Sequence, residues 1–346
     1  MQNTQFSVLA ITLLAGVSIA GCSGSDTSSQ AAAIAAAGAP SSTGSGGSAG
    51  VSTVVGGGGS VAQAGGVSLN LPDEPAMAGR PGVVLPSEPY PDTLPDGFTA
   101  ANMFGGYRVG AEISPGGETP VDPLDPKLEG CGTTILAVIR DFKADGKNFE
   151  GGEDVFYDDH GVVLPTLGAD RKPVFAGTGR TLTIKDPAQF ADWYRTVDGV
   201  NKAYKLELWF APNAGVSSFQ STSFFPLDHI ATADKGNAEH NYYFTTEIHT
   251  SFKYQGGESF KFTGDDDVWV FINNKLAIDL GGVHPAENAA IDIDARAVEL
   301  GLEKGKVYNF DMFQNERHRF DSNFRADTNL NFVDCGTILP DPVIPK

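Results

Sequence analysis

The feature that most constrains the fold is a pair of strand-like segments separated by two asparagines. Residues 268–272, Val-Trp-Val-Phe-Ile, are all apolar, and residues 275–279 follow directly after Asn273 and Asn274. β-branched and aromatic runs are typical of strands, and asparagine tolerates the positive φ that a two-residue type I′ turn requires. We therefore predict a β-hairpin over residues 268–279, with an apolar and buried first strand.

Most of the sequence between residues 131 and 335 shows a period of two, which indicates further strands. Asp186 followed by Pro187 predicts one short helix, because aspartate caps a helix and proline fits its first position. A second short turn is expected over residues 296–300. Many strands and few helices predict an all-β fold, an antiparallel β-sandwich with one or two short helices. The further strands are expected over residues 133–141, 206–210, 242–252, 259–262, 289–294 and 307–313.

The N-terminus carries an apolar run over residues 6–19 that is too short to span a bilayer and has the form of a secretory signal peptide. Its end, Ile19-Ala20-Gly21-Cys22, resembles the bacterial lipobox. Residues 1–21 are thus predicted to be the signal peptide and Cys22 the lipidation site; the alternative is ordinary signal cleavage after which Cys22 is lost or unmodified. Because Ser23 follows, the resemblance to lipoproteins implies a lipid anchor in the cell outer membrane, with the domain surface-exposed or facing the periplasm.

Two segments separate this predicted anchor from the predicted domain. Residues 22–66 consist almost entirely of Gly, Ser and Ala, which predicts a flexible linker. Residues 67–130 are Pro-rich and acidic, and we expect them to form an extended, semi-rigid stalk. The whole chain carries 24 Lys and Arg against 43 Asp and Glu, a net charge of −19. This balance argues against nucleic-acid binding, and membrane contact is expected through the lipid anchor only.

The remaining two cysteines, Cys131 and Cys335, bracket the segment with the strand pattern. In an exported protein the expected state of such a pair is a disulfide, and the alternative is two separate buried thiols. A bridge across so long a loop would stabilise the domain by about 5 kcal/mol by the chain-entropy argument. We therefore predict one domain over residues 131–335, followed by a C-terminal tail over residues 336–346.

Three adjacent carboxylates, Asp265, Asp266 and Asp267, stand immediately before the apolar strand of the hairpin. Like charges this close repel one another at neutral pH, so a positive group is expected to offset them. Carboxylate oxygens are the ligands that Ca²⁺ prefers, and it takes six to eight oxygen donors. The alternative is a solvated acidic turn whose charges are screened by water and salt. Composition alone does not separate these two interpretations.

Seven segments of this sequence resemble the signature of the fibro-slime domain family, and they cover essentially residues 131–335. The family is similar to the protective-antigen-type β-sandwich superfamily, which includes the carbohydrate-binding domains of yeast flocculins and many bacterial adhesins. The resemblance therefore implies a β-sandwich that binds sugars. The segments are GDDDVWVFINNKLAIDLGGVH (264–284), IRDF (139–142), WYRTVDGVN (193–201), FFPLD (224–228), HNYYFTTEI (240–248), FQNERH (313–318) and SNF (322–324).

The resemblance also implies a calcium site. Lectins of that superfamily bind Ca²⁺ with two consecutive aspartates, which match Asp265 and Asp266, whereas Asp267 stands where relatives usually have glycine. The triple aspartate is nevertheless the fibro-slime form, so Asp267 is included among the expected ligands. Further ligands come from a loop after a later strand, here expected directly after residues 307–313. Asn315 is the candidate amide ligand and Glu316 a further oxygen donor.

Four more residues near these segments are candidates for ligand contact, each with a structural alternative where the sequence suggests one. Asp279 ends the second hairpin strand, and His284 follows it; a histidine hydrogen-bonded within a turn is the favoured alternative for His284. Arg317 and His318 follow the candidate metal ligands. For Arg317 we favour an ion pair that orders the loop over contact with a sugar.

Catalytic motifs are weak in this sequence, and we expect no enzymatic activity. It contains neither a His-Glu-x-x-His zinc motif nor a Gly-x-Ser-x-Gly nucleophile elbow. By resemblance, the expected function is Ca²⁺-dependent binding of a glycan or polysaccharide in adhesion or matrix attachment. The alternative is a calcium-rigidified structural module that binds a surface protein or matrix partner and has no lectin activity.

Overall fold

The computed structural model describes residues 94–114, 133–144, 157–177, 184, 186–230, 233–234, 236 and 238–339. The chain divides into two compact units, Met1–Ser68 and Leu69–Lys346, and all of the described residues belong to the second. Within these residues, no helix has the length and apolar character needed to cross a bilayer. The predicted signal peptide, Cys22, the linker and the C-terminal tail beyond residue 339 lie outside the described part.

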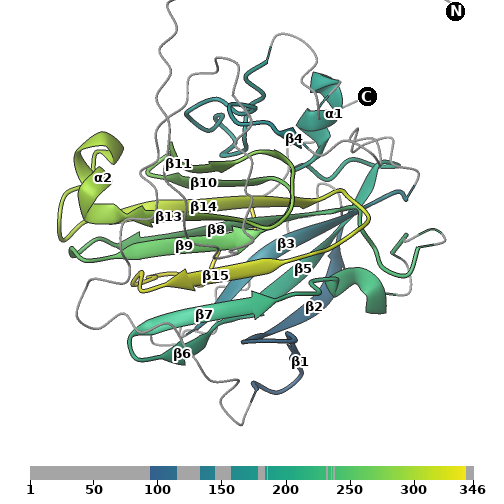
Figure 1. Ribbon diagram of the computed structural model, residues 1–346, viewed down its shortest axis with the longest axis horizontal. Helices are drawn as coiled ribbons and strands as arrows, with labels where there is room; N and C mark the ends of the chain where they lie inside the picture. Colours follow the sequence, from purple (N-terminus) through teal and green to yellow (C-terminus); the bar gives the residue numbers. More distant parts are fainter. Residues whose placement is uncertain are drawn as a thin grey trace, which may run out of the picture. The chain divides into compact units, whose positions relative to one another are not determined.

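Two antiparallel sheets form the body of the domain (Figure 1), so the predicted β-sandwich class is confirmed. The larger sheet has the strand order β1-β2-β5-β3-β8-β14-β10-β11, and the smaller has the order β13-β9-β15-β7-β6. The larger sheet contains β1 (Thr99–Ala100), β2 (Gly106–Ile113), β5 (Asn201–Trp209), β3 (Thr134–Phe142), β8 (Phe244–Lys253), β14 (Val307–Glu316), β10 (Val268–Ile272) and β11 (Lys275–Leu280).

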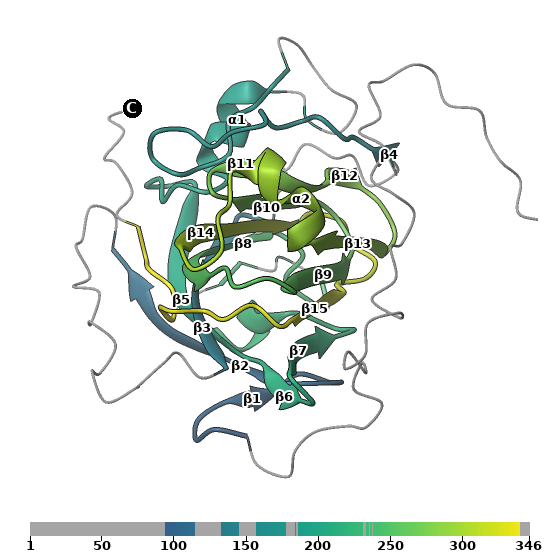
Figure 2. The ribbon, with the colours of Figure 1, turned by 90° about the vertical axis from the view of Figure 1, so that its left-hand side faces the viewer.

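The smaller sheet and the short elements complete the described fold. A two-stranded sheet joins β4 to β12, and the two α-helices of the described residues lie at opposite margins of the domain (Figures 1 and 2). The smaller sheet contains β13 (Glu287–Asp292), β9 (Ser259–Gly264), β15 (Phe324–Thr328), β7 (Val216–Ser221) and β6 (Ala211–Asn213); the rest are β4 (Tyr157–Asp158), β12 (Gly282–Val283), α1 (Pro187–Asp192), α2 (Ile293–Leu300) and the 3₁₀ helix η2 (Pro226–His229).

The main core lies between the two sheets. Alternate residues of the long strands enter it, as a period of two requires; on β8 these include Phe244, Ile248 and Phe252. Phe219 and Phe324 of the smaller sheet meet edge to face with ring centroids 5.5 Å apart. This core is rich in phenylalanine.

A second apolar cluster covers the other face of the larger sheet. Trp269 and Phe271 of β10 and Phe313 of β14 pack there against residues of the segment 157–200. Phe190 of helix α1 contacts Trp269 with ring centroids 5.9 Å apart. The central strands are therefore buried on both faces, which explains why β10 is apolar at every position.

Several local predictions are confirmed. β10 and β11 form the expected hairpin, and Asn273 and Asn274 adopt φ values of 50° and 64° at its turn. Helix α1 begins at Pro187, and Asp186 caps it by accepting a hydrogen bond of 2.8 Å from the backbone N–H of Ala188.

Three predictions need correction. The region expected to be a stalk contributes β1 and β2, and β2 pairs with β5 inside the larger sheet, so the sheet begins well before residue 131. The turn expected over residues 296–300 is the end of the longer helix α2. Strand β14 continues to Glu316, so Asn315 and Glu316 lie in the strand and not in a loop. Asn315 and Glu316 continue the pairing of β14 with Thr245 and Phe244 of β8.

Cys335 is buried and disulfide-bonded. Cys131 lies outside the described residues, so the pairing of these two cysteines stays a prediction.

Candidate functional site

The three aspartates connect the two sheets. β9 of the smaller sheet ends at Gly264, and β10 of the larger sheet begins at Val268, so the aspartates form the whole connection. All three are buried, with Asp265 5%, Asp266 2% and Asp267 0% exposed. Asp266 has a φ of 55°, a left-handed conformation that aspartate adopts more readily than most residues. The alternative of a solvated acidic turn does not match this burial.

Asp267 is neutralised by Arg317, which is also fully buried. Its Oδ2 accepts a hydrogen bond of 2.5 Å from Arg317 Nε, and its Oδ1 accepts one of 3.0 Å from Nη2. Gly282 N–H and the Asn315 side-chain amide donate further hydrogen bonds to the same carboxylate. The Arg317 guanidinium also lies 5.2 Å from the centroid of the Trp193 ring. The ion pair favoured for Arg317 from the sequence is present, and its partner is Asp267.

The other carboxylates of the site depend on neutral donors. Asp265 accepts hydrogen bonds from the backbone N–H and side-chain amide of Asn323. Asp266 accepts a hydrogen bond of 2.7 Å from the backbone N–H of Arg317. Glu316 is 0% exposed, and its Oε2 has no hydrogen-bond partner in the described part of the chain. We refer to Asp265, Asp266, Asp267 and Glu316 as the carboxylate cluster.

The electrostatics of this cluster are unfavourable for negative charge. Burial raises the pKa of Asp266 to about 7, although Arg317 opposes this shift. Burial, followed by the charges of Asp266 and Asp265, raises the pKa of Glu316 well above its usual range. Burial also raises the pKa of Asp265. Four buried carboxyl groups thus share one guanidinium, and that guanidinium forms its ion pair with Asp267.

The remaining residues predicted for the site have structural contacts. The Asn315 side-chain oxygen accepts a hydrogen bond of 2.5 Å from the Tyr194 hydroxyl. Asp279 accepts hydrogen bonds from Trp269 Nε1 and from the Gly161 N–H. His284 is buried, and its two ring nitrogens face backbone carbonyls, as expected for a histidine within a turn. Roles of Asn315, Asp279 and His284 in ligand binding stay predictions.

Sequence reasoning missed an exposed aromatic residue beside the cluster. Phe320 is 64% exposed, and the His318 ring lies against it with ring centroids 4.7 Å apart. The segment that carries both begins after Glu316 and ends at Asn323, and the carboxylate cluster bonds its two ends. The sequence does contain one indication of this residue: Phe320 is a single aromatic residue between the charged residues Arg319 and Asp321.

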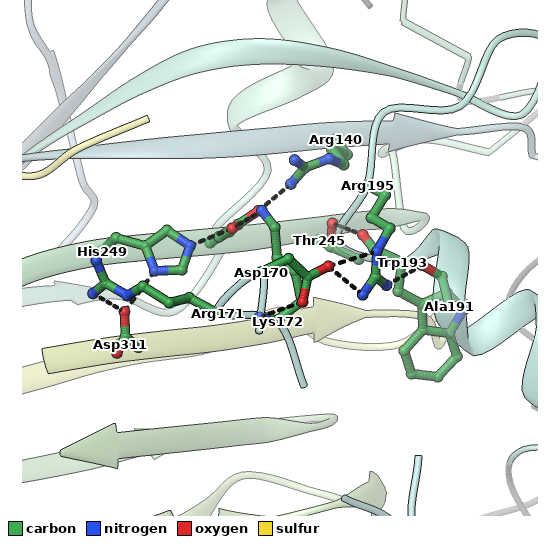
Figure 3. A network of polar contacts seen from close by, with 11 residues as sticks. Arg140, Asp170, Arg171, Lys172, Ala191, Trp193, Arg195, Thr245, His249 and Asp311 are labelled. Carbon is green, nitrogen blue, oxygen red and sulfur yellow. Dashed lines mark hydrogen bonds and ion pairs between the residues drawn. The ribbon is translucent and has the colours of Figure 1, made fainter. Parts of the chain in front are cut away.

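A second group of buried charges lies on the outer face of the same sheet (Figure 3). Glu247 of β8 forms ion pairs with Arg140 of β3, at 2.5 Å, and with Lys172. Lys172 belongs to residues 157–177, which pack on this face of the sheet and which we call the covering segment. His249 Nε2 contacts the same carboxylate. Burial disfavours this charge, but Lys172 and Arg140 outweigh burial and hold the pKa of Glu247 well below its usual range.

The same group continues to the next strand. His249 Nδ1 lies 2.6 Å from Asp311 Oδ1 on β14, and Arg171 forms an ion pair with that oxygen, while Asp311 Oδ2 accepts no hydrogen bond. We refer to Arg140, Arg171, Lys172, Glu247, His249 and Asp311 as the ion-pair network. Its two carboxylates face the side chains of two arginines and one lysine, so it fastens the covering segment to the sheet without an external ion.

Among the described residues, no group of three or more His, Cys, Asp and Glu side chains is arranged so that it could hold a metal ion as it stands. The donor chemistry of the carboxylate cluster nevertheless fits a hard cation, since Asp265, Asp266 and Glu316 offer oxygens whose charges are not offset by ion pairs of their own among the described residues. The oxygens of Asp267 and Asn315 are taken by Arg317 and Tyr194. These two residues hold the cluster in place.

Comparisons with known proteins give relatives for about half of the chain. Protein psiJ of Dictyostelium discoideum is 38% identical over 202 residues, which is 51% of this chain and 27% of psiJ. Protein psiC of the same organism is 37% identical over 199 residues, which is 51% of this chain and 38% of psiC. The chain thus matches between a quarter and two fifths of the length of these relatives.

Solved structures give weaker similarity. The PA14 domain of the antifreeze protein MpAFP is 10% identical with a TM-score of 0.28, covering 62% of this chain and 95% of that domain. The PA14 sugar-binding domain of an RTX adhesin is 9% identical with a TM-score of 0.25, covering 57% of this chain and 90% of that domain. TM-scores this low establish no shared mechanism. The family comparison is more direct: residues 197–342 match the PA14 domain family, and this part of the chain is similar to PA14 domains.

Proposed function

We propose that this domain binds carbohydrate through a Ca²⁺ ion held by Asp265, Asp266 and Glu316. The observation that carries the proposal is the carboxylate cluster, in which buried carboxyl groups outnumber their cationic partner and Glu316 Oε2 accepts no hydrogen bond. A buried carboxylate without a partner is costly, and a bound cation removes that cost. The PA14 match over residues 197–342 supports a carbohydrate-binding or adhesion module.

Each residue of the cluster has a distinct part in this proposal. Asp265, Asp266 and Glu316 supply hard oxygen donors of the kind that Ca²⁺ prefers. Asp267 and Asn315 keep these donors in position through Arg317 and Tyr194. When bound, Ca²⁺ supplies open coordination positions that water or vicinal sugar hydroxyls occupy. The donors are held at a defined position, because the aspartates connect β9 of the smaller sheet to β10 of the larger sheet and Glu316 ends β14.

Phe320 supplies the apolar part of the proposed sugar site. A pyranose ring has an apolar face, and pockets that bind small ligands combine aromatic surface with a few polar groups. Phe320 is exposed at the edge of the segment that the carboxylate cluster anchors, and His318 supports it from one side. We assign sugar stacking to Phe320 and support of that ring to His318.

The cellular setting that fits this function follows from the N-terminal sequence. Cys22 is proposed as the lipid anchor in the outer membrane, residues 23–66 as the flexible linker, and Cys131 and Cys335 as a disulfide that closes the domain. Many anchored copies would bind a glycan surface more tightly than one domain does, because linked binding events add avidity. A hydrolytic activity is not part of the proposal.

A glycan array tests the proposal directly. Wild type and the Asp265→Asn/Asp266→Asn variant are applied with Ca²⁺ and again with a chelator, with Asp96→Asn at an exposed position as the control. We expect glycan binding by wild type and Asp96→Asn only in Ca²⁺, and none by the double variant. Retained Ca²⁺-dependent binding by the folded double variant would rule out the proposed coordination.

The second candidate is a structural or protein-binding module that Ca²⁺ only rigidifies. The burial of the cluster between the sheets favours it, because an ion there would stiffen both. In that case Ca²⁺ raises the melting temperature of wild type but no glycan on the array gives a signal. A competition experiment also separates the two candidates. Soluble sugar is added while the protein mediates cell-surface attachment, and only the lectin function predicts that the sugar inhibits attachment.

A further inference from the structure

A cavity of about 390 Å³ lies at one end of β2, β3 and β5, outside the carboxylate cluster. Ile113 of β2 and Val200 at the entrance to β5 form its apolar part, and Phe142 of β3 lies behind the lining with a fully buried side chain. Its lining includes parts of two segments singled out in the sequence, IRDF (139–142) and WYRTVDGVN (193–201), neither of which contributes a donor to the carboxylate cluster. The volume falls in the range of about 300–1,000 Å³ that is typical of small-molecule sites.

Buried hydrogen bonds hold one wall of this cavity. Asp141 is 4% exposed, and its carboxylate accepts hydrogen bonds of 2.6 Å from Asn241 Nδ2 and 3.0 Å from the Asp234 N–H. Asn241 is itself fully buried. This wall is therefore fixed before any ligand enters.

The opposite wall is held in the same way. Asn201 is 7% exposed, and its side-chain oxygen accepts a hydrogen bond of 3.1 Å from the Val197 N–H. Its amide donates to the carbonyl oxygens of Asp192 and Arg195. Asn201 thus fastens the turn over residues 197–200 to the residues that precede it. Both walls are therefore formed before a ligand binds, which lowers the entropy cost of binding.

The lining identifies the chemistry of the ligand. Lys143 and Lys202 supply hydrogen-bond donors, and Glu112, Asp198 and Asp234 supply acceptors around the apolar part. A ring with several hydroxyl groups satisfies both kinds, because each hydroxyl donates and accepts, and its apolar face fits the wall of Ile113 and Val200. Carboxyl groups outnumber ammonium groups in the lining, which disfavours an acidic sugar.

The cavity and the carboxylate cluster lie at the same end of the larger sheet. Phe244 of β8 pairs with Asp141 of β3 on one side and with Glu316 of β14 on the other. Two strand spacings of about 4.8 Å place these positions about 10 Å apart, within the length of a short oligosaccharide. One glycan chain can therefore reach both places.

We propose that this cavity is a second sugar subsite, which binds a neutral pyranose residue of the same glycan whose other end lies at the carboxylate cluster. The proposal rests on the proposed function, since it extends the sugar site along the sheet. It goes further in naming the ligand: a neutral oligosaccharide longer than one residue, in preference to a monosaccharide or a uronate.

The test uses chain length as its variable. The probes are glucose, galactose and mannose oligosaccharides of one to four residues and the corresponding uronates, printed on an array and followed by titration of the strongest one. The cavity variant Asp198→Ala/Lys202→Ala changes two exposed lining residues. The matched control, Glu303→Ala/Lys306→Ala, removes an exposed ion pair at the opposite end of β14.

We expect wild type and the control to bind longer neutral chains more tightly than the monosaccharide. The cavity variant should lose about tenfold in affinity for the longer chains, as expected for one or two lost hydrogen bonds, and keep its affinity for the monosaccharide. If the cavity variant matches wild type at every length, the second subsite is wrong while the proposed function stands. If wild type binds no glycan at all, the proposed function fails and this inference fails with it.

Discussion

Two groups of buried charge on the larger sheet shift the pKa of a buried glutamate in opposite directions. In the ion-pair network, Glu247 contacts Arg140 and Lys172, and these cations hold its pKa well below the usual range. In the carboxylate cluster, Glu316 is equally buried but adjoins Asp266 and Asp265, and its pKa is raised well above the usual range. Both residues lie on neighbouring strands of one sheet.

The difference separates a structural role from a proposed binding role. In the network, Arg140, Lys172 and Arg171 form ion pairs with the buried carboxylates. These ion pairs attach the covering segment to β3, β8 and β14. The cluster is not compensated in this way, because the ion pair seen for it among the described residues joins Asp267 to Arg317 and leaves Asp265, Asp266 and Glu316 with neutral donors. Burial of a charge alone therefore does not indicate a ligand site; burial without compensation does.

The largest expected effect comes from breaking the network. Glu247→Gln leaves Arg140 and Lys172 buried without their carboxylate, and we expect the free energy of unfolding to fall by about 3–5 kcal/mol. Denaturant unfolding measures the change. Glu207→Gln is the matched control, since Glu207 also pairs with an arginine, Arg108, on a neighbouring strand but at the surface. Its expected cost is below about 1 kcal/mol, and equal costs for the two variants would contradict the comparison.

The opposite sign is expected in the cluster. Glu316→Gln removes a carboxyl group that is costly to bury, so in chelator at pH 7.5 the variant should be more stable than wild type by at least about 1 kcal/mol. Added Ca²⁺ should then stabilise wild type and leave the variant almost unchanged. A destabilised Glu316→Gln in chelator, measured by the same denaturant unfolding, would show that the cluster is compensated after all.

The pH dependence follows from the same pKa shifts. Asp265, Asp266 and Glu316 have raised pKa values, so the stability they contribute is present below their unfolded pKa and is lost as pH rises through the folded values, about 7 for Asp266. In chelator, the melting temperature should thus fall by several degrees between pH 5 and pH 8. The Asp265→Asn/Asp266→Asn variant should show a smaller fall. A melting temperature that rises over this range in wild type would contradict the assignment.

The smallest effect on stability is expected at the exposed edge of the site. Phe320→Ala removes a ring that is 64% exposed, so the free energy of unfolding should change by less than about 0.5 kcal/mol. Its affinity for a bound glycan should fall about fivefold, which corresponds to about 1 kcal/mol of lost stacking. Val298→Ala, at a 96% exposed position on helix α2, is the control and should change neither quantity. Unchanged glycan affinity in Phe320→Ala would remove this residue from the site.

The parts of the fold set by local sequence were predictable. The Asn273-Asn274 turn and the capped start of α1 need only neighbouring residues, and both are as expected. The position of the three aspartates before β10 was also visible in the sequence. Membership of β2 in the sheet was not, because its pairing with β5 joins residues about a hundred positions apart.

The partners of the buried charges could not be predicted from the sequence either. Glu247 meets Arg140 and Lys172 only through the sheet and the covering segment, at separations of 107 and 75 residues. The resemblance to lectins implied a loop for Asn315 and Glu316, whereas here they lie in β14 and face the aspartates and Tyr194. Distinguishing a compensated from an uncompensated carboxylate required the tertiary structure.

The most direct test of the central claim is a calcium titration of the chelator-treated domain by isothermal calorimetry. The account predicts saturable Ca²⁺ binding by wild type and by Glu207→Gln, and its loss in Glu316→Gln and in Asp265→Asn/Asp266→Asn. A wild-type domain that takes up no Ca²⁺ at millimolar concentration, or one that binds no better than Glu316→Gln, would contradict it.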